Sequence, residues 1–401
     1  MTGVATAPRT TSADRSGKVT VRPLASGEER TLAEVMRRSF GGLGAGMFSR
    51  GEAAFVAELD DRIVGGVVLT SFRIDASRRG GMVKWLFTLP EARARGVASR
   101  LLDRGLAWFD EVGVTDAFTC IEALNAPSRN RFAQRGFEPV GFVEQVRRYG
   151  ARLPLVWWHT NHVVDVGDLL WVQRRDDAAE DRAAAGAAAL DGAQAREDAP
   201  AFDDAAGSWG LGGLVATLAV HAGFVALMLA RMGVGHDATT VGRYLLAIAL
   251  VIGVRTGAMA LVGAAAGVRL RYHPWETGML LVGAITLVFG RIVFLAPGIV
   301  VPRQRTWSTR ELAPVLARMG FAGAGAVMAL GALAAWAVSA GVATGVASPL
   351  LLYARIMVLL DVLLPFFPLT AFSGMRMLQA SRAGWALMAV GAIALWVVAW
   401  L

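Results

Sequence analysis

Cysteine and lysine are almost absent from this 401-residue sequence. The single cysteine, Cys120, excludes an internal disulfide and a metal cluster held by several thiolates. Because Lys18 and Lys84 are the only lysines, the net charge of +8 comes from arginine. The arginines are scattered or flank apolar stretches, which fits the positive-inside rule for membrane proteins better than a nucleic-acid surface. We therefore expect membrane lipids among the partners, and no nucleic acid.

Charged residues are also scarce in the second half of the chain. Residues 209–401 contain repeated apolar runs of about 20 residues, the length that crosses a bilayer. They raise the mean hydropathy to +0.47, whereas residues 19–170 have the pattern of a soluble α/β domain. The N-terminus is polar and lacks the apolar core of a signal peptide. We expect a multi-pass protein of the cell membrane with its N-terminal domain in the cytoplasm.

Composition divides the chain into four parts. Residues 1–18 have no apolar period, which predicts a disordered tail. Residues 174–208 are rich in Ala, Asp, Glu and Gly, which predicts a flexible linker. Between them, residues 19–173 make up the soluble α/β domain with a C-terminal extension. Residues 209–401 make up an all-α polytopic transmembrane domain of five or six spans.

The soluble domain alternates strand patterns with helix patterns. Residues 41–46 include four glycines and predict a flexible loop that forms one wall of a substrate cleft. In chain order, the predicted elements are strand 19–24, helix 28–40, strands 54–59, 63–74 and 81–89, helix 99–112, strand 117–123, helix 125–135, and strands 137–140 and 145–153.

A basic turn joins the strand at 81–89 to the helix at 99–112. A helix N-terminus offers unpaired N–H groups and the positive end of the helix dipole, so it can hold a phosphate. Gly96 and Ala98 let the backbone approach an anion closely, and Arg93 and Arg95 add positive charge. The turn is therefore predicted to be a phosphate-binding cradle.

Residues 19–155 resemble the GNAT acetyltransferases in the order of their elements and in two motifs. The family's pyrophosphate-binding pattern, Gln/Arg-x-x-Gly-x-Gly/Ala, is met by residues 93–98, with Pro90 just before it. The second motif is an Asn ahead of a helix that ends in Gly-Phe, and it is met by Asn125 and residues 136–137. The resemblance implies a GNAT-like domain with a mixed central sheet flanked by helices.

The resemblance also implies an activity, which is transfer of an acetyl group from acetyl-CoA to an amine that attacks directly in a ternary complex. The strand before the cradle would bind the pantetheine arm through backbone groups, the cradle would bind the pyrophosphate, and Asn125 would anchor the opposite wall. The residues implied in acetyl-CoA binding are Leu86, Phe87, Thr88, Arg93, Ala94, Arg95, Gly96, Val97, Ala98, Ser99, Asn125 and Phe132.

Phe132 departs from the family pattern, which usually has a tyrosine at this position to protonate the leaving thiolate. Phenylalanine has no proton to donate, so either the thiolate leaves unassisted or the domain binds acyl-CoA without turnover. Ser128 and Tyr149 are substitute donors by residue type. Glu122, at the end of its strand, is the candidate general base. The alternative reading of Glu122 is a partly solvated acid without a catalytic role.

His159, His162, Asp165 and Asp168 recur at every third position, so they would form one stripe on a helix. Two His and two Asp could bind a divalent metal. The alternative is the polar face of an amphipathic segment whose Trp and Val side chains lie on the sheet or at the membrane interface. We favour this alternative and predict no metal site.

Six apolar segments follow the linker. If all six crossed from a cytosolic N-terminus, the arginines at 303–318 and 376–382 would face outward, against the positive-inside rule. The conflict disappears if the third segment, which contains Pro297, is re-entrant or broken, and only Arg231 and Arg243 then lie outside. The six segments are 210–230, 243–266, 277–301, 319–340, 349–372 and 384–401.

Residues 240–380 resemble the site-2 proteases in three stretches, at 267–275, at 294–298, and at 365–369 with 373–376. The catalytic residues of that family are missing. Where the family has His-Glu-x-x-His, this chain has Arg255-Thr256-Gly257-Ala258-Met259, and Thr370 or Ser373 stands where the metal-binding Asp would be. Zinc catalysis needs about three protein ligands and a polarised water. The resemblance therefore implies a protease-like scaffold without protease activity.

Four ionisable residues lie within the apolar segments: Arg255, Arg291, Arg355 and Asp361. Such groups are costly in a membrane and are usually paired or functional. We expect an ion pair of Asp361 with Arg255 or Arg291, which either fixes helix packing or marks a binding site for a lipid or polar substrate. His221, in the first segment, is expected to be a helix-packing donor rather than a metal ligand.

These patterns lead to two main functional hypotheses. The first is a membrane-anchored, acyl-CoA-dependent N-acyltransferase that uses acetyl-CoA and whose acceptor is a small-molecule, lipid-linked or protein amine. The alternative is a non-catalytic acyl-CoA sensor coupled to an inactive, protease-like membrane domain that binds a lipid or a partner. A third hypothesis, transport, rests only on the intramembrane charges and the broken third segment.

Overall fold

The structure of the chain is a computed structural model that describes residues 19–46, 51–122, 124–162, 168–175, 210–233, 237–303, 309–342, 344–363 and 372–397. The predicted tail and most of the predicted linker lie outside these residues. The chain forms two compact units, one of residues 1–73 with 81–114 and one of residues 74–80 with 115–401. The second unit therefore contains both the end of the soluble domain and the helical part.

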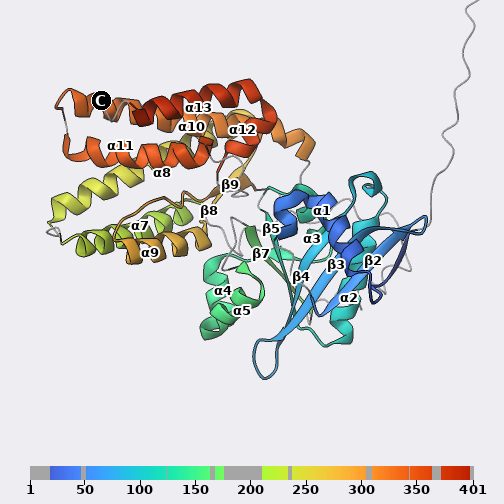
Figure 1. Cartoon of the computed structure of the whole chain (residues 1–401). Coiled ribbons are helices and arrows are strands. Elements are labelled where there is room, and N and C mark those ends of the chain that lie inside the picture. The colour runs from blue at the N-terminus through green and yellow to red at the C-terminus, as the bar shows by residue number, and fades with distance from the viewer. Residues whose placement is uncertain are drawn as a thin grey trace, which may run out of the picture. The chain divides into compact units, whose positions relative to one another are not determined.

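The first unit carries the first strands of the sheet and the helices beside them (Figure 1). Its elements are β1 (Thr20–Pro23), α1 (Glu29–Gly46), β2 (Ala53–Leu59), β3 (Arg62–Arg73), β4 (Arg79–Thr88), the 3-10 turn η1 (Pro90–Ala92) and α2 (Val97–Glu111). The strands lie in the order β1-β2-β3-β4, and β1 pairs with β2 and β2 with β3 in antiparallel fashion. Asp60 and Asp61 join β2 to β3 with φ of +51° and +58°, values that suit a two-residue hairpin turn.

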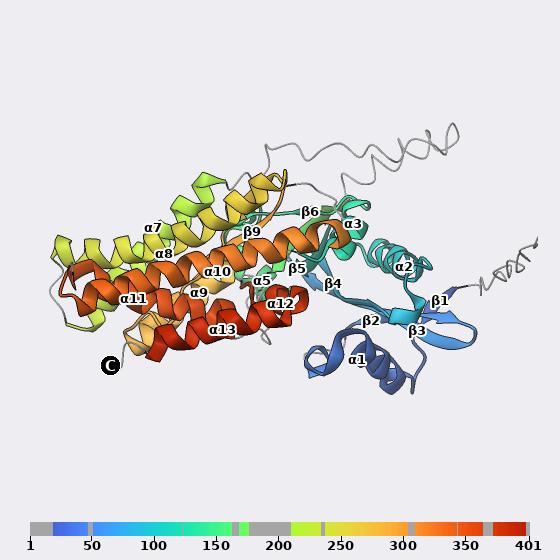
Figure 2. The ribbon, with the colours of Figure 1, turned by 90° about the horizontal axis from the view of Figure 1, so that it is seen from above.

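Two adjacent glycines in β3 let helices approach both faces of these strands (Figure 2). A Cβ on Gly65 would lie 2.7 Å from the carbonyl oxygen of Phe87 and 3.1 Å from Val97 of α2. A Cβ on Gly66 would lie 2.5 Å from Leu32 of α1. Because side chains alternate along a strand, the two positions face opposite sides. The start of α2 is thus held directly against β3 and β4.

The predicted loop at 41–46 is wrong, because α1 continues to Gly46. Glycine lowers helix propensity by about 1 kcal/mol per residue but does not forbid the helical backbone. The other elements predicted up to residue 140 are present, and their ends differ from the prediction only at the terminal residues.

The second unit begins with the remaining strands of the sheet. Its first elements are β5 (Asp116–Glu122), α3 (Ala126–Ala133), β6 (Glu138–Pro139), α4 (Phe142–Tyr149), the 3-10 turn η2 (Gly150–Arg152), α5 (Leu153–His159) and β7 (Asp168–Arg174). β7 pairs antiparallel with β5, with Asp168 opposite Glu122, and β6 pairs with the other edge of β7. The sheet has seven strands in all, and the predicted mixed sheet with flanking helices is confirmed.

The region after residue 140 differs from the prediction. The expected strand at 145–153 is wrong, because Phe142–Tyr149 form α4, in which buried Gln145 and Tyr149 are four residues apart on one helix face. The expected helical stripe of His and Asp is also wrong. His159 ends α5, Asp168 begins β7, and Asp165 lies outside the described residues.

The rest of the second unit is a helical part (Figure 1). Its elements are α7 (Leu211–Arg231), α8 (Ala238–Ala265), β8 (Leu270–His273), α9 (Glu276–Phe289), β9 (Ile299–Pro302), α10 (Thr309–Ser339), α11 (Thr344–Val358), the π-helical turn η4 (Leu359–Leu363), α12 (Gly374–Ala380) and α13 (Arg382–Val397). Among the described residues, four helical stretches are long and apolar enough to cross a membrane: Leu211–Arg231, Ala238–Ala265, Glu311–Ser339 and Gly345–Leu363. α9 and α13 are apolar but shorter.

The third apolar segment is broken, which was one of the two alternatives that the sequence left open, but the helix stops earlier than Pro297. α9 is capped by Gly290, whose φ of +69° is the left-handed conformation that terminates helices. The chain then returns through β9 to pair with β8, with Ile299 opposite His273. Residues 274–298 therefore begin and end at the same place in the helical part.

Side chains from neighbouring elements satisfy the non-helical backbone of this segment. The amide of Ala296 donates to His221 Nε2 at 3.3 Å, and the hydroxyl of Tyr272 donates to the carbonyl oxygen of Pro297 at 2.9 Å. The other ring nitrogen of His221, Nδ1, lies 2.8 Å from the carbonyl oxygen of Thr217. In an apolar setting such backbone groups must find partners inside the protein. His221 thus has a packing role, but toward the neighbouring segment it accepts a hydrogen bond and is not the donor that was expected.

A buried ion pair joins α8 to η4. Arg255 donates to Asp361 through Nε at 2.6 Å and Nη2 at 2.8 Å, and both side chains are 1% exposed. The same carboxylate accepts the amide of Ser373, the N-cap of α12, at 3.1 Å. The predicted ion pair of Asp361 is therefore confirmed, with Arg255 as the partner.

We predict that Asp361→Asn lowers the stability of the full chain by about 3–5 kcal/mol, because Arg255 would stay buried without a counter-charge. The measurement is the midpoint of thermal unfolding in detergent micelles. The double variant Arg255→Met/Asp361→Leu removes both charges and should recover most of the loss. Asp237→Asn is the control, since Asp237 is exposed and caps α8, and asparagine caps equally well. Equal losses in the single and double variants would contradict the prediction.

Candidate active site

The loop between β4 and α2 has the backbone of an anion cradle. Ala94 and Gly96 adopt φ of +62° and +73°. Gly96 is the N-cap of α2, and the first turn of the helix therefore has no side-chain cap. Arg93 and Arg95 are exposed in the same loop. An uncapped helix N-terminus that follows a left-handed turn presents its amides and its positive dipole end to an anion.

The end of β4 supplies a polar group next to this cradle. The side chain of Phe87 is 3% exposed and packs against Phe40, with ring centroids 6.2 Å apart, while Leu86 and Thr88 are half-buried. Thr88 Oγ1 is buried and has no hydrogen-bond partner among the described residues. A buried hydroxyl without a partner is costly, so it marks a place where the polar group of a ligand fits. The strand and the cradle together suit a molecule with a long arm attached to a diphosphate, as in coenzyme A.

The candidate residues divide between the two units. Residues 86–99 belong to the first unit, and Glu122, Asn125 and Phe132 belong to the second. In the second unit a tight turn follows β5, in which the amide of Asn125 donates to the carbonyl oxygen of Glu122 at 2.9 Å. Asn125 Oδ1 accepts the amide of Ser128 at 3.2 Å and so caps α3. Asn125 therefore has a structural role as the cap of α3, and this role does not depend on a ligand.

Glu122 has the electrostatic setting of a general base. Solvent reaches its side chain, yet surrounding protein partly desolvates the carboxyl and raises its pKa, and the nearby Arg376 guanidinium opposes this rise. A base acts best when its pKa approaches the working pH. The direction of the shift thus favours the catalytic reading of Glu122 over that of a solvated surface acid.

Tyr149 does not replace the missing proton donor at this end of β5. Phe132 is 3% exposed and lies edge-on to Phe137, with ring centroids 5.1 Å apart. The hydroxyl of Tyr149 donates to Asp116 at 3.3 Å, which is the opposite end of β5 from Glu122. At about 3.3 Å per residue the two ends of this strand are roughly 20 Å apart. Tyr149 as a substitute donor beside Glu122 is therefore wrong.

The helical part reaches the same turn. Leu124 and Ala126 flank Asn125 and pack into a cluster with side chains of α8, β8, β9 and α10, among them Met259, Tyr272, Val300, Val315 and Met319. The positive charge of Arg376 in α12 acts to lower the pKa of Glu122, and the negative charge of Glu122 acts to raise the pKa of Arg376. In the sequence Arg376 served as a marker of membrane topology and as part of the stretch 373–376, and nothing connected it with Glu122. Their electrostatic interaction depends on segments that are far apart along the chain.

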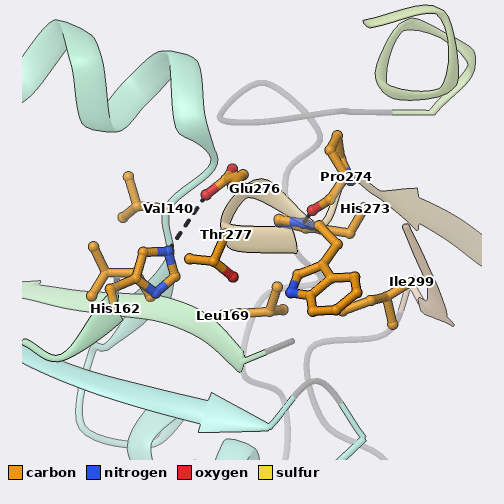
Figure 3. A pocket seen from close by; sticks show the side chains of 10 residues that line it. Val140, His162, Leu169, His273, Pro274, Glu276, Thr277 and Ile299 are labelled. Carbon is orange, nitrogen blue, oxygen red and sulfur yellow. Dashed lines mark hydrogen bonds and ion pairs between the residues drawn. The ribbon is translucent and has the colours of Figure 1, made fainter. Parts of the chain in front are cut away.

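A second polar cluster lies where α5 and β7 meet the start of α9 (Figure 3). His162 and Glu276 point toward each other, with Nε2 and Oε2 3.6 Å apart. Gln145 Nε2 donates to the same Glu276 oxygen at 3.2 Å, and the indole N–H of Trp157 donates to Gln145 Oε1 at 2.7 Å. His162 and Glu276 line a small cavity, and these contacts fasten residues 145–162 to the helical part.

Comparison with known proteins bears on the soluble domain. Residues 28–137 match the model of the acetyltransferase (GNAT) family. This stretch contains the cradle, Glu122, Asn125 and Phe132, and it ends before the helical part. None of the curated proteins matches the chain.

Solved structures also align with part of the chain. N-acetylglutamate synthase from Neisseria gonorrhoeae, solved with coenzyme A and N-acetyl-glutamate, is 21% identical with a TM-score of 0.28, over 39% of this chain and 35% of its own. The PaiA N-acetyltransferase from Thermoplasma acidophilum, solved with coenzyme A, is 16% identical with a TM-score of 0.28, over 39% of this chain and 99% of its own. Naa50 from Arabidopsis thaliana, solved with a bisubstrate analogue, is 13% identical with a TM-score of 0.29, over 38% of this chain and 96% of its own. This chain thus spans about a third of the first of these proteins.

We predict that Gly96→Ala weakens acetyl-CoA binding at least tenfold, or about 1.4 kcal/mol. The left-handed backbone at Gly96 strains any residue with a Cβ by roughly 1–2 kcal/mol, so alanine would disturb the backbone of the cradle even though the space around it is open. Gly113→Ala is a matched control, because Gly113 has φ of +71° and open space around it, but lies beyond the C-terminal end of α2. Calorimetric titration of both variants is the measurement. Equal affinities would contradict the assignment of the cradle.

Proposed function

We propose that this chain is a membrane-held, acyl-CoA-dependent N-acyltransferase that transfers an acetyl group from acetyl-CoA to an amine. The observation that carries the proposal is the uncapped, arginine-flanked N-terminus of α2, in a stretch that matches the GNAT family. The choice of acetyl over longer acyl groups, and of an amine as acceptor, belongs to the proposal. The role of Glu122 as the base rests on its position and on the direction of its pKa shift.

In the proposed reaction, the cradle and Thr88 bind and orient the donor while Glu122 accepts a proton from the attacking amine. The amine nitrogen forms a bond to the thioester carbonyl carbon, the carbon–sulfur bond breaks, and its electron pair leaves with the thiolate of coenzyme A. Positioning and proton removal supply most of the catalysis in such a site. Because a thiolate is a weak base, it can leave without an acid at the position of Phe132.

We predict that Glu122→Gln lowers kcat/KM by about 10²- to 10⁴-fold, because the amide cannot accept the proton. In the native protein, activity should fall as the pH drops through the pKa of Glu122, which is raised above its ordinary value. This acid limb should therefore lie above the range of a free glutamate and should vanish in the variant. The pH profile of thiol release measures both effects. An unchanged profile would show that Glu122 is not the base.

The sensor is the second candidate function, and Phe132 is the observation that favours it. We predict that the full chain binds acetyl-CoA in a calorimetric titration and releases free thiol with at least one member of a broad amine panel. Binding without thiol release across the panel would favour the acyl-CoA sensor. That the membrane domain of this sensor is an inactive, protease-like scaffold would remain a prediction. The absence of binding would contradict both functions.

We further propose that the helical part crosses the membrane five times, with residues 274–298 re-entrant from the cytoplasmic side. The pairing of β8 with β9 supports this, as does the hydrogen bond of 2.9 Å from the amide of Arg303 to the carbonyl of Arg269. Both flanks of the segment then face the cytoplasm together with Arg318 and Arg376, which agrees with the positive-inside rule.

We predict the labelling pattern of single-cysteine variants built on Cys120→Ser and treated in intact cells with a membrane-impermeant maleimide. Val342→Cys, in the exposed turn between α10 and α11, should be labelled from outside. Arg303→Cys should be labelled only after the cells are permeabilised. External labelling of Arg303→Cys would contradict the re-entrant segment.

A further inference from the structure

We propose that the acceptor is a membrane phospholipid with a primary amine in its headgroup, whose phosphate binds Arg376 and whose amine loses its proton to Glu122. The inference rests on the acyltransferase function proposed above and assigns the class of its acceptor. It is based on α10, in which two consecutive residues are associated with the turn after β5 and with α12, respectively.

Met319 and Gly320 of α10 hold the two partners of this site. Met319 lies in the cluster that contains Ala126 and against which Leu124 packs, four and two residues after Glu122 in the chain. A Cβ on Gly320 would lie 3.0 Å from the Cβ of Ser373 and 3.3 Å from Met377, so glycine allows α12 to approach α10 closely. Two consecutive residues of α10 therefore belong, one to the cluster at the turn after β5, and the other to the contact with the helix that carries Arg376.

Contacts at the start of α12 fix Arg376 itself. Its Nη2 donates to the carbonyl oxygen of Phe372 at 3.2 Å and lies 3.4 Å from Ser373 Oγ. The amide of Ser373 is in turn bonded to Asp361, which the Arg255 pair holds in place. The guanidinium thus has a defined position rather than that of a free surface arginine.

The same level of α10 marks a membrane boundary. Exposed Arg318 precedes Met319, and residues 319–339 are apolar up to the end of the helix at Ser339. A stretch of this length spans about 30 Å, the thickness of the hydrocarbon core. Leu261 of α8, two residues beyond Met259 of the cluster, is 73% exposed, as a side chain in contact with lipid tails would be. We therefore place Glu122 and Arg376 at the level of phospholipid headgroups.

The charges at this level complement a zwitterionic headgroup. Arginine binds phosphate oxygens through its planar fork of N–H donors. A carboxylate attracts an ammonium group and can accept one proton from it, which leaves the neutral amine with the lone pair that attack requires. A phosphate and a primary amine only a few bonds apart therefore match Arg376 and Glu122. The nitrogen then forms the amide bond as the carbon–sulfur bond breaks, its second proton goes to the leaving thiolate, and the products are an N-acetylated lipid and free coenzyme A.

The test uses the full chain in phosphatidylcholine vesicles with acetyl-CoA, and follows thiol release together with the mass of the lipid. Three arms supply the amine as phosphatidylethanolamine at increasing mole fraction, as soluble phosphoethanolamine, or as ethanolamine. We expect turnover in the lipid arm to exceed that in either soluble arm at least tenfold, with an acetylated lipid as product. Preference for a soluble amine would overturn the lipid inference while leaving the acyltransferase function standing. Thiol release in no arm would overturn both.

Substitution of Arg376 tests the phosphate contact. Arg376→Gln should raise the KM for the lipid at least tenfold with a smaller change in kcat, and Arg376→Lys should restore part of the loss. Arg318→Gln is the matched control, because it removes the same charge from the same boundary outside the site, and its KM should change less than twofold. Acetyl-CoA titration of each variant reports whether the soluble domain is folded. Equal KM values for Arg376→Gln and Arg318→Gln would overturn the role of Arg376.

Discussion

The buried ion pair between Arg255 and Asp361 connects three parts of the helical region that are far apart in the chain. Its two hydrogen bonds fasten α8 to the π-helical turn after α11, and the same carboxylate receives the amide that begins α12. Two charges in an apolar interior are tolerated only when each satisfies the other and the remaining lone pairs find donors. That requirement gives the pair one geometry and fixes the position of Arg376 three residues beyond Ser373.

In the described part of the chain, backbone groups outside helices and strands find hydrogen-bond partners at one place and are left without a side-chain partner at another. In the broken segment 290–298, His221 and Tyr272 satisfy an amide and a carbonyl, so this stretch is a packing element. At the N-terminus of α2, glycine stands where a capping side chain would, and the adjoining Thr88 hydroxyl is buried without a partner among the described residues. Unsatisfied polar groups are costly in a folded protein, so their concentration at one place favours a ligand there.

The soluble domain could be predicted from sequence wherever the signal is local. The hydrophobic period and the two GNAT-like motifs predicted the helices and strands up to residue 140 and the cradle between β4 and α2. Prediction failed for Tyr149, because its residue type gives no hint that α4 packs it against Asp116 rather than near Glu122. It also missed the β8–β9 ribbon and the position of Arg376, both of which depend on contacts between distant segments. The sequence limited the ion-pair partner of Asp361 to Arg255 or Arg291. It could not decide between them, because the choice depends on how the helices pack.

The strength of one guanidinium contact bears on why such an enzyme would sit in a membrane. A charge-assisted hydrogen bond contributes about 1.5–3 kcal/mol, whereas millimolar binding of a soluble molecule needs about 4 kcal/mol. Arg376 alone would thus hold a soluble amine only weakly. An acceptor in the same bilayer is confined near the site, and confinement raises its effective concentration in the way a tether does. A modest contact is then enough to select the headgroup, and the binding free energy that remains can orient the amine toward Glu122. If the proposed function holds, the helical part contributes to catalysis by fixing the level at which the turn after β5 meets the lipid.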